Sequence, residues 1–122
     1  MFLLYKAGIC VEDRVAVGWL FSFYGPLLTE RQRSLISLYC EEDYSLSEIA
    51  AREGISRQGV YDAVRRGERQ LEAYERQLGL LARYRRLTEG LGESLRILED
   101  APGEQAQQAR ELLAALLSQE EE

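Results

Sequence analysis

Residues 45–66, SLSEIAAREGISRQGVYDAVRR, constrain the fold of this chain more than any other segment, because their pattern is that of a helix-turn-helix. Ala50 is small enough to let the second helix pack closely against the first. Gly54 can adopt the left-handed conformation that the turn requires. Apolar residues fall where two short crossing helices must share a core: Ile49, Ile55, Val60 and Val64.

Capping residues mark both helix starts within this segment. Ser45 and Glu48 have the spacing of a capping box, and Ser56 is a favourable N-cap for the second helix. The segment therefore predicts a helix-turn-helix. Such units also serve as purely structural corners, so the motif alone does not establish nucleic-acid binding.

The composition argues against catalysis. The chain has 122 residues, enough for one compact domain with an appendage, and it contains no histidine. Histidine-based acid–base catalysis, nucleophile activation by histidine and imidazole zinc sites are thus excluded, and there is no glycine-rich phosphate loop. The two cysteines, Cys10 and Cys40, are far apart, which favours reduced thiols over a disulfide or a metal site. We expect no enzymatic activity, no cofactor and no metal.

The apolar opening, MFLLYKAGIC, is too short to span a bilayer. We expect residues 1–11 to form an extension against the core. No later segment approaches about 20 uninterrupted apolar residues, so we expect a soluble, cytoplasmic protein with no membrane insertion.

Charge is unevenly distributed along the chain. The net charge is −2 over residues 1–44, +3 over 45–87 and −7 over 88–122. The middle third is therefore the part suited to phosphate contact, whereas the acidic tail would be repelled by phosphate.

Apolar periodicity predicts an all-α fold. The expected helices are 12–24, with Val15, Trp19, Leu20 and Phe23 on its apolar face, then 29–39, the two motif helices, and a last helix over 105–119. Thr29 and Gln32 form a second capping box. The second motif helix has no proline or obvious stop, so we expect it to run from residue 56 to 87, about 45 Å. A short amphipathic helix is expected after Gly90 and Gly92.

This plan gives three parts: the extension 1–11, a helix-turn-helix domain with a long helix at 12–87, and an acidic, amphipathic helical tail at 88–122. Along the long helix, apolar residues repeat with three- and four-residue spacing at Leu71, Tyr74, Leu78 and Leu81. The seam could pack on the first helix of the same chain or on a second copy. The helices carry more apolar surface than a small core can bury. We therefore expect a homodimer with this seam at its interface.

The exposed face of the second motif helix supplies candidates for nucleic-acid binding: Ser56, Arg57, Gln58, Tyr61, Arg65, Arg66 and Arg69. Arginine and glutamine can each form two hydrogen bonds to a base edge, and the later arginines suit phosphates. Asp62 argues against binding, because an anion on this face repels phosphate. The alternative is a solvated helix face with ion pairs such as Asp62 to Arg66.

Three sequence segments resemble a known family: FxFYxxLLTxRQ at 21–32, SLSEIA at 45–50, and SRQxVYD at 56–62. Residues 12–87 are similar to the YlxM proteins, and more distantly to the fourth region of bacterial sigma factors, which recognises the promoter −35 element. The extension, the tail and Gly59, where the family has alanine, depart from the pattern.

The resemblance implies a sigma region four-like helix-turn-helix core and an accessory, regulatory role in the signal recognition particle pathway. The implied partners are the GTPase of the particle or its RNA. Two alternatives remain open: a DNA-binding transcription regulator, and a protein–protein adaptor whose helix-turn-helix touches no nucleic acid.

Overall fold

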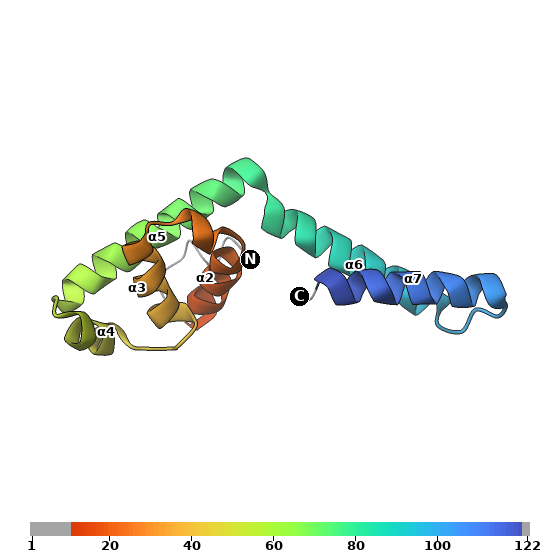
Figure 1. Ribbon diagram of the computed structural model, residues 1–122, viewed down its shortest axis with the longest axis horizontal. Coiled ribbons are helices and arrows are strands. Elements are labelled where there is room, and N and C mark those ends of the chain that lie inside the picture. The colour runs from red at the N-terminus through yellow and green to blue at the C-terminus, as the bar shows by residue number, and fades with distance from the viewer. Residues whose placement is uncertain (1–10, 121–122) are drawn as a thin grey trace. The chain divides into compact units, whose positions relative to one another are not determined.

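The computed structural model describes residues 11–120, and all regular secondary structure within that range is helical (Figure 1). The all-α prediction is confirmed. The expected N-terminal extension, with Cys10, lies outside the described residues except for Val11, which is already helical. The chain forms two compact units that divide between Gly79 and Leu80.

The first unit contains the helix-turn-helix. Its elements are α2 (Val11–Tyr24), the 3₁₀ turn η1 (Gly25–Leu27), α3 (Glu30–Cys40), α4 (Leu46–Glu53) and α5 (Arg57–Leu78). Helices α2, α3 and α4 all pack on α5 (Figure 1). Their shared core is apolar and includes Val17, Leu20, Leu35, Ile36, Ile49, Val60, Val64 and Leu71.

Local capping signals form as predicted. The Thr29 hydroxyl accepts a hydrogen bond from the Gln32 amide at 3.2 Å, and the Ser45 hydroxyl accepts one from the Glu48 amide at 3.0 Å, each within a complete capping box. Gly54 ends α4 with φ of 69°, the left-handed conformation expected for the turn. The predicted helix-turn-helix is therefore present.

Gly67 and Arg14 lie at contacts between helices of the first unit. Gly67 lies where α5 crosses α3, and a Cβ there would come within 2.9 Å of Ile36 Cδ1. The Arg14 guanidinium on α2 lies 4.0 Å from the centre of the Tyr39 ring and donates to the Tyr39 carbonyl at 2.6 Å and the Tyr44 carbonyl at 3.1 Å. Arg14 therefore anchors α2 to the end of α3 and to the link before α4.

The long helix is shorter than predicted. It ends at Leu78, because Gly79 adopts φ of 63° and its N–H bonds the Glu75 carbonyl at 2.8 Å. This left-handed C-cap is the conformation that glycine permits and that terminates many helices. The expected continuity from residue 56 to 87 is thus wrong. The interruption expected at Gly90 and Gly92 is also wrong, since one helix runs through both.

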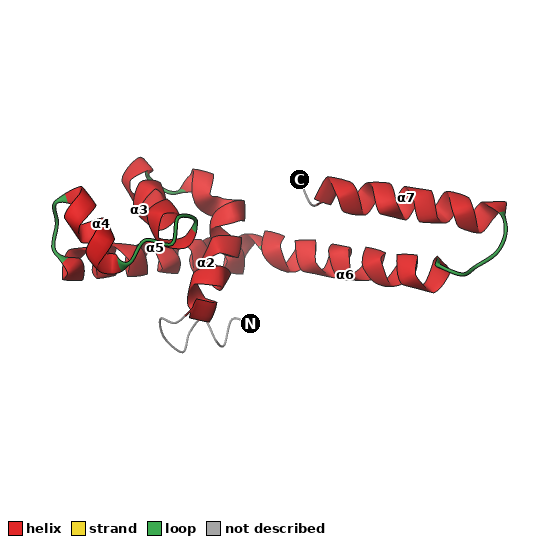
Figure 2. Cartoon of the chain, turned by 90° about the horizontal axis from the view of Figure 1, so that it is seen from below, coloured by secondary structure: helices red, strands yellow, loops and turns green. Residues whose placement is uncertain are grey.

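The second unit is a helical hairpin of α6 (Leu80–Leu98) and α7 (Glu104–Glu120), which lie antiparallel side by side (Figure 2). The Arg110 guanidinium on α7 donates to the carbonyls of Leu98 at 2.6 Å and Ala101 at 2.8 Å. Arg110 thus ties α7 to the end of α6 and to the turn, as a second donor to the Leu98 carbonyl beside the Ala101 amide at 3.1 Å. No helix among residues 11–120 has the length and apolar character needed to cross a bilayer.

Candidate nucleic-acid interface

The N-terminal end of α5 presents polar side chains to solvent. The Ser56 hydroxyl caps the helix by accepting a hydrogen bond from the Gly59 amide at 2.9 Å. Arg57 and Gln58 are exposed. The Gln58 amide donates to Asp62 Oδ1 at 3.0 Å, so Asp62 orients a neighbouring side chain on this face. Ser56 therefore has a capping role, and Arg57 and Gln58 are the residues available to a ligand.

The basic residues further along α5 fall into two classes. Arg66 and Arg69 are exposed. Arg65 is half-buried and pairs with Glu68 at 3.3 Å, and Glu68 is only 2% exposed. A nearly buried carboxylate is costly unless it is paired. Arg65 therefore stabilises the fold, and its replacement would not test binding cleanly.

Arg76 extends this basic face and was missed in the sequence-based set. It is exposed on α5, seven residues after Arg69 and eleven after Arg65. Spacings of four, seven and eleven residues return to nearly the same side of an α-helix, so these arginines form one stripe of about 16 Å. The signal was available in the sequence as an arginine in phase with two others. We call Gln58, Arg66, Arg69 and Arg76 the α5 basic face; Arg57, at the first position of the helix, lies to one side of it.

Tyr61 is half-buried, with part of its surface open to solvent. Glu72, also on α5, is half-buried and close in sequence to Arg69 and Arg76, and it reduces the local positive charge. The α5 basic face is therefore a mixed surface with a positive stripe, and phosphate contact rests on a small number of arginines.

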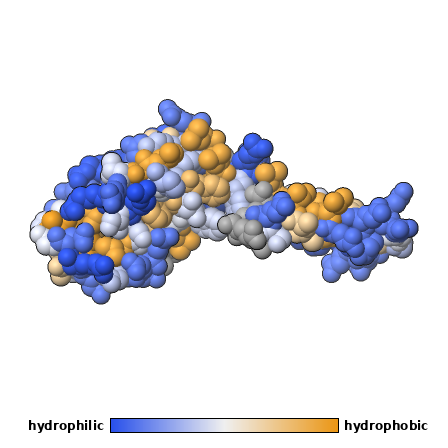
Figure 3. All heavy atoms as spheres, in the orientation of Figure 1, coloured by the Kyte–Doolittle hydropathy of each residue, from blue (hydrophilic) through white to orange (hydrophobic). Residues whose placement is uncertain are grey.

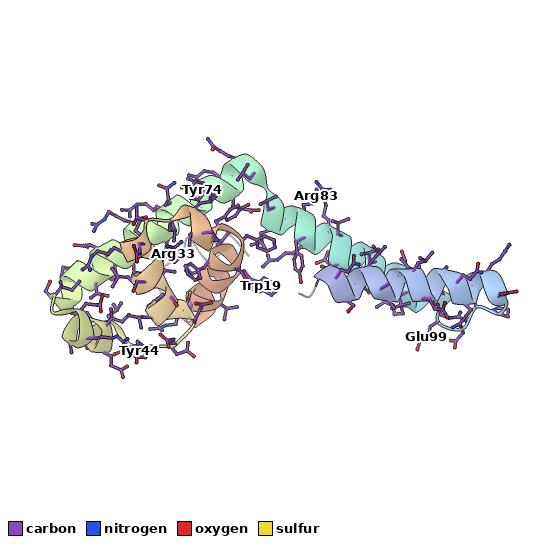
Figure 4. All side chains as sticks on the ribbon, in the orientation of Figure 1. Trp19, Arg33, Tyr44, Tyr74, Arg83 and Glu99 are labelled. Carbon is purple, nitrogen blue, oxygen red and sulfur yellow. The ribbon has the colours of Figure 1, made fainter. Side chains whose placement is uncertain are left out.

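The seam predicted as a dimer interface is mostly closed off. Leu71 is fully buried, because α5 packs this side on the other helices of the first unit. The Tyr74 ring, labelled in Figure 4, lies with its centroid 6.0 Å from that of the Tyr24 ring at an interplanar angle of 34°, and its hydroxyl donates to the Leu27 carbonyl at 3.3 Å. Leu81 belongs to α6 in the second unit and is buried too. Of the four residues, Leu78 alone is well exposed, so the seam as predicted does not offer a continuous interface.

An open cavity of about 330 Å³ lies elsewhere in the first unit, between α2 and the end of α3. It is lined by Arg14, Val15, Gly18, Trp19, Ser22 and Cys40. Burial raises the pKa of the Cys40 thiol to about 12, with a further contribution from Glu41. A thiol with so high a pKa is a poor nucleophile at neutral pH. The described residues contain no group of three histidine, cysteine or carboxylate side chains suited to a metal ion.

Comparison with known proteins places this arrangement in a family. Residues 11–112 match the family described as "Putative helix-turn-helix protein, YlxM / p13 like". The match covers α2 to α6 and part of α7, so it continues well beyond residue 87, where the sequence resemblance was expected to end.

Individual relatives agree. The chain is 45% identical over 106 residues to a UPF0122 protein of Symbiobacterium thermophilum, covering 87% of this chain and 96% of the relative. It is 44% identical over 108 residues to a UPF0122 protein of Halalkalibacterium halodurans, covering 88% and 94%. A UPF0122 protein of Streptococcus agalactiae is 52% identical over 74 residues, covering 61% and 67%. The chain therefore belongs to the UPF0122 family of YlxM/p13-like helix-turn-helix proteins.

Proposed function

We propose that this protein is a non-catalytic accessory component of the signal recognition particle pathway that binds the RNA of the particle through the α5 basic face. The observation that carries the proposal is the exposed series of Arg66, Arg69 and Arg76 along one side of α5, the second helix of the helix-turn-helix. The YlxM relationship supports the choice of pathway, because the sequence resemblance implies that role for the family.

The chemistry of α5 favours contact with phosphates and unpaired bases of a structured RNA. A helix seldom enters the deep, narrow major groove of A-form RNA. The arginine side chains of α5 can instead bind phosphates of the RNA backbone, and Gln58 can hydrogen-bond an unpaired base. The GTPase of the particle is the proposed protein partner, with the acidic residues of the second unit suited to a basic surface.

A second candidate function is sequence-specific binding of duplex DNA. The exposed Arg57 and Gln58 at the N-terminal end of α5 favour it, because this is the end from which a recognition helix reads base edges. Arginine prefers guanine and glutamine prefers adenine in such contacts.

A binding competition separates the two functions. The purified full chain is titrated with the RNA of the particle and with a random duplex DNA library at equal salt. Preference for the RNA, with recovery of the particle from a lysate that is lost after nuclease treatment, supports the first proposal. Enrichment of one duplex sequence without RNA preference would replace it with the second.

A further inference from the structure

The helical hairpin of the second unit cannot enclose a core by itself. Two antiparallel helices cover each other along one line only, and a closed helical core generally requires a bundle of about four helices. Leucines accordingly remain at the surface of the hairpin: Leu87 is 42% exposed, Leu112 68% and Leu116 47%. Figure 3 shows apolar atoms gathered over part of the hairpin, while its turn end is hydrophilic.

The exposed leucines lie on one side of the hairpin. Thr88 and Gly92 on α6 and Leu113 and Leu117 on α7 are half-buried, as expected of positions that face the other helix. Leu87 and Leu91 precede the first pair by one residue, and Leu112 and Leu116 precede the second pair by one residue. One residue back is a rotation of about 100° on each helix.

Because the two helices are antiparallel, the same backward rotation turns both sets of leucines towards the same side. We call Leu87, Leu91, Leu112 and Leu116 the leucine face; Leu91 is half-buried and the other three are exposed. Exposed apolar side chains that are contiguous in this way mark an interaction surface.

The rim of the leucine face identifies the kind of partner. Other residues on the side of α7 that carries Leu112 and Leu116 are uncharged and exposed. They are Gln105, Gln108 and Gln119. A partner that covers the leucine face therefore buries no charge of this chain along α7, which fits a second apolar surface and does not fit nucleic acid.

Charge complementarity identifies that partner as a second copy. The start of α6 carries the exposed Arg83 and Arg86, whereas its turn end carries the exposed Glu99 and Asp100; Figure 4 labels Arg83 and Glu99. Two arginines near the turn are engaged locally, since Arg96 pairs with Glu93 and Arg110 binds backbone carbonyls. A two-fold axis that lies in the interface plane and crosses the helices at their middle sets the basic start of each α6 beside the acidic turn end of the partner's α6.

We infer that two copies of this chain pair through their leucine faces, forming an antiparallel four-helix bundle from two α6–α7 hairpins. The interface thus lies on the second unit, and not on the α5 seam. The two-fold axis passes near Leu112, since this residue and Leu91 occupy the middle of their helices. Each dimer carries two α5 basic faces, and pairing itself is measured without any nucleic acid.

The test uses the full chain in sedimentation velocity at tens of micromolar. The wild type is expected to sediment as a dimer, and Leu116→Glu as a monomer with helical circular dichroism retained. Ile97→Glu is the matched control, because Ile97 is 71% exposed and lies two residues after Leu95, on the side of α6 away from α7. This control is expected to stay dimeric. A monomeric wild type, or a Leu116→Glu variant that remains dimeric, would overturn the inference.

Cross-linking tests the geometry even if a charged variant unfolds. In a chain with Cys10→Ser and Cys40→Ser, mild oxidation of Leu112→Cys is expected to yield a disulfide-linked dimer, while Ile97→Cys is not. For the antiparallel orientation, copies carrying Arg83→Cys are mixed with copies carrying Glu104→Cys and treated with a short bismaleimide. Mixed cross-links are expected, and their absence alongside efficient Leu112 cross-linking would refute the antiparallel arrangement.

Discussion

The Tyr24 hydroxyl donates a 2.5 Å hydrogen bond to Glu75 Oε1, and this bond ties the end of α2 to the last turns of α5. Both residues are buried. A carboxylate in such a position needs strong donors, because its burial is otherwise costly. The bond fixes the direction of the distal half of α5, the part that carries Arg76.

Replacing Tyr24 with Phe is expected to destabilise the first unit by about 1–3 kcal/mol, because it removes a hydroxyl donor from a buried carboxylate while keeping the ring. Urea denaturation followed by circular dichroism measures the change. Tyr74→Phe is the control, since the Tyr74 hydroxyl makes a longer, exposed bond at 3.3 Å and its removal should cost little. Equal midpoints for wild type and Tyr24→Phe would show that the bond contributes nothing.

Gly67 permits the close crossing of α5 and α3. A Cβ at this position would lie 2.9 Å from Ile36 Cδ1 and 3.0 Å from Cγ1, and Ile36 is fully buried. We expect Gly67→Val to destabilise the unit by about 1–3 kcal/mol through overpacking. Gly90→Ala serves as a control in α6, where the added methyl meets nothing within 4 Å and should stabilise the helix by about 0.5–1 kcal/mol. Unchanged stability of Gly67→Val would mean that the helices separate easily.

Gly54 is expected to be sensitive for a different reason. A Cβ there would meet no atom within 4 Å, but φ is +69°, so the cost is conformational. Gly54→Val should lower the stability of the helix-turn-helix by about 1–2 kcal/mol or more, and Gly54→Asn by less, because asparagine tolerates the left-handed region. Thermal melts compare the two variants. A Val variant as stable as the Asn variant would contradict the assigned strain.

The features predicted correctly from sequence are those encoded by neighbouring residues. Capping boxes and the Gly54 turn depend on spacings of three or four residues, so they can be read without knowledge of tertiary packing. Gly79 shows the limit of such signals. A glycine without a following proline can sit inside a helix, as Gly90 does, or end it in the left-handed conformation, as Gly79 does.

Which apolar residues are buried was harder to predict, because several sectors of a helix can be apolar. On α2 the expected face was Val15, Trp19, Leu20 and Phe23. Leu20 is buried as expected, yet Val15 and Trp19 are exposed, and Val17 and Tyr24 are buried instead. On α5, Leu71 of the predicted seam is buried because the other helices of the first unit pack against it, and this packing depends on the tertiary fold. The sequence likewise predicts phosphate contact for Arg65. The structure pairs Arg65 with the buried Glu68 instead, and the burial of Glu68 depends on the tertiary fold.

Cys40 should be slow to alkylate in the folded chain. Burial raises its pKa to about 12 from an ordinary value of 9.0, so almost no thiolate exists at pH 8. Above pH 9 the unfolded chain loses this proton first, so the thiol contributes stability that declines as the pH rises from about 9 to 12. Iodoacetamide labelling of a Cys10→Ser variant measures the rate, with the urea-unfolded chain as control. Equal rates in the two states would contradict the burial of the thiol.

Binding of the particle's RNA by the α5 basic face is tested most directly by the salt dependence of RNA affinity. Fluorescence anisotropy is measured from 50 to 200 mM salt for the wild type and for Arg69→Ala and Arg76→Ala, which are exposed and have no structural pairing role in α5 like that of Arg65. If an arginine binds a phosphate, its replacement should weaken RNA binding and reduce the magnitude of the salt slope by about 0.7–0.9. Arg96→Ala, on α6, should leave both affinity and slope unchanged. Wild-type affinity and slope in both α5 variants would contradict RNA binding by this face.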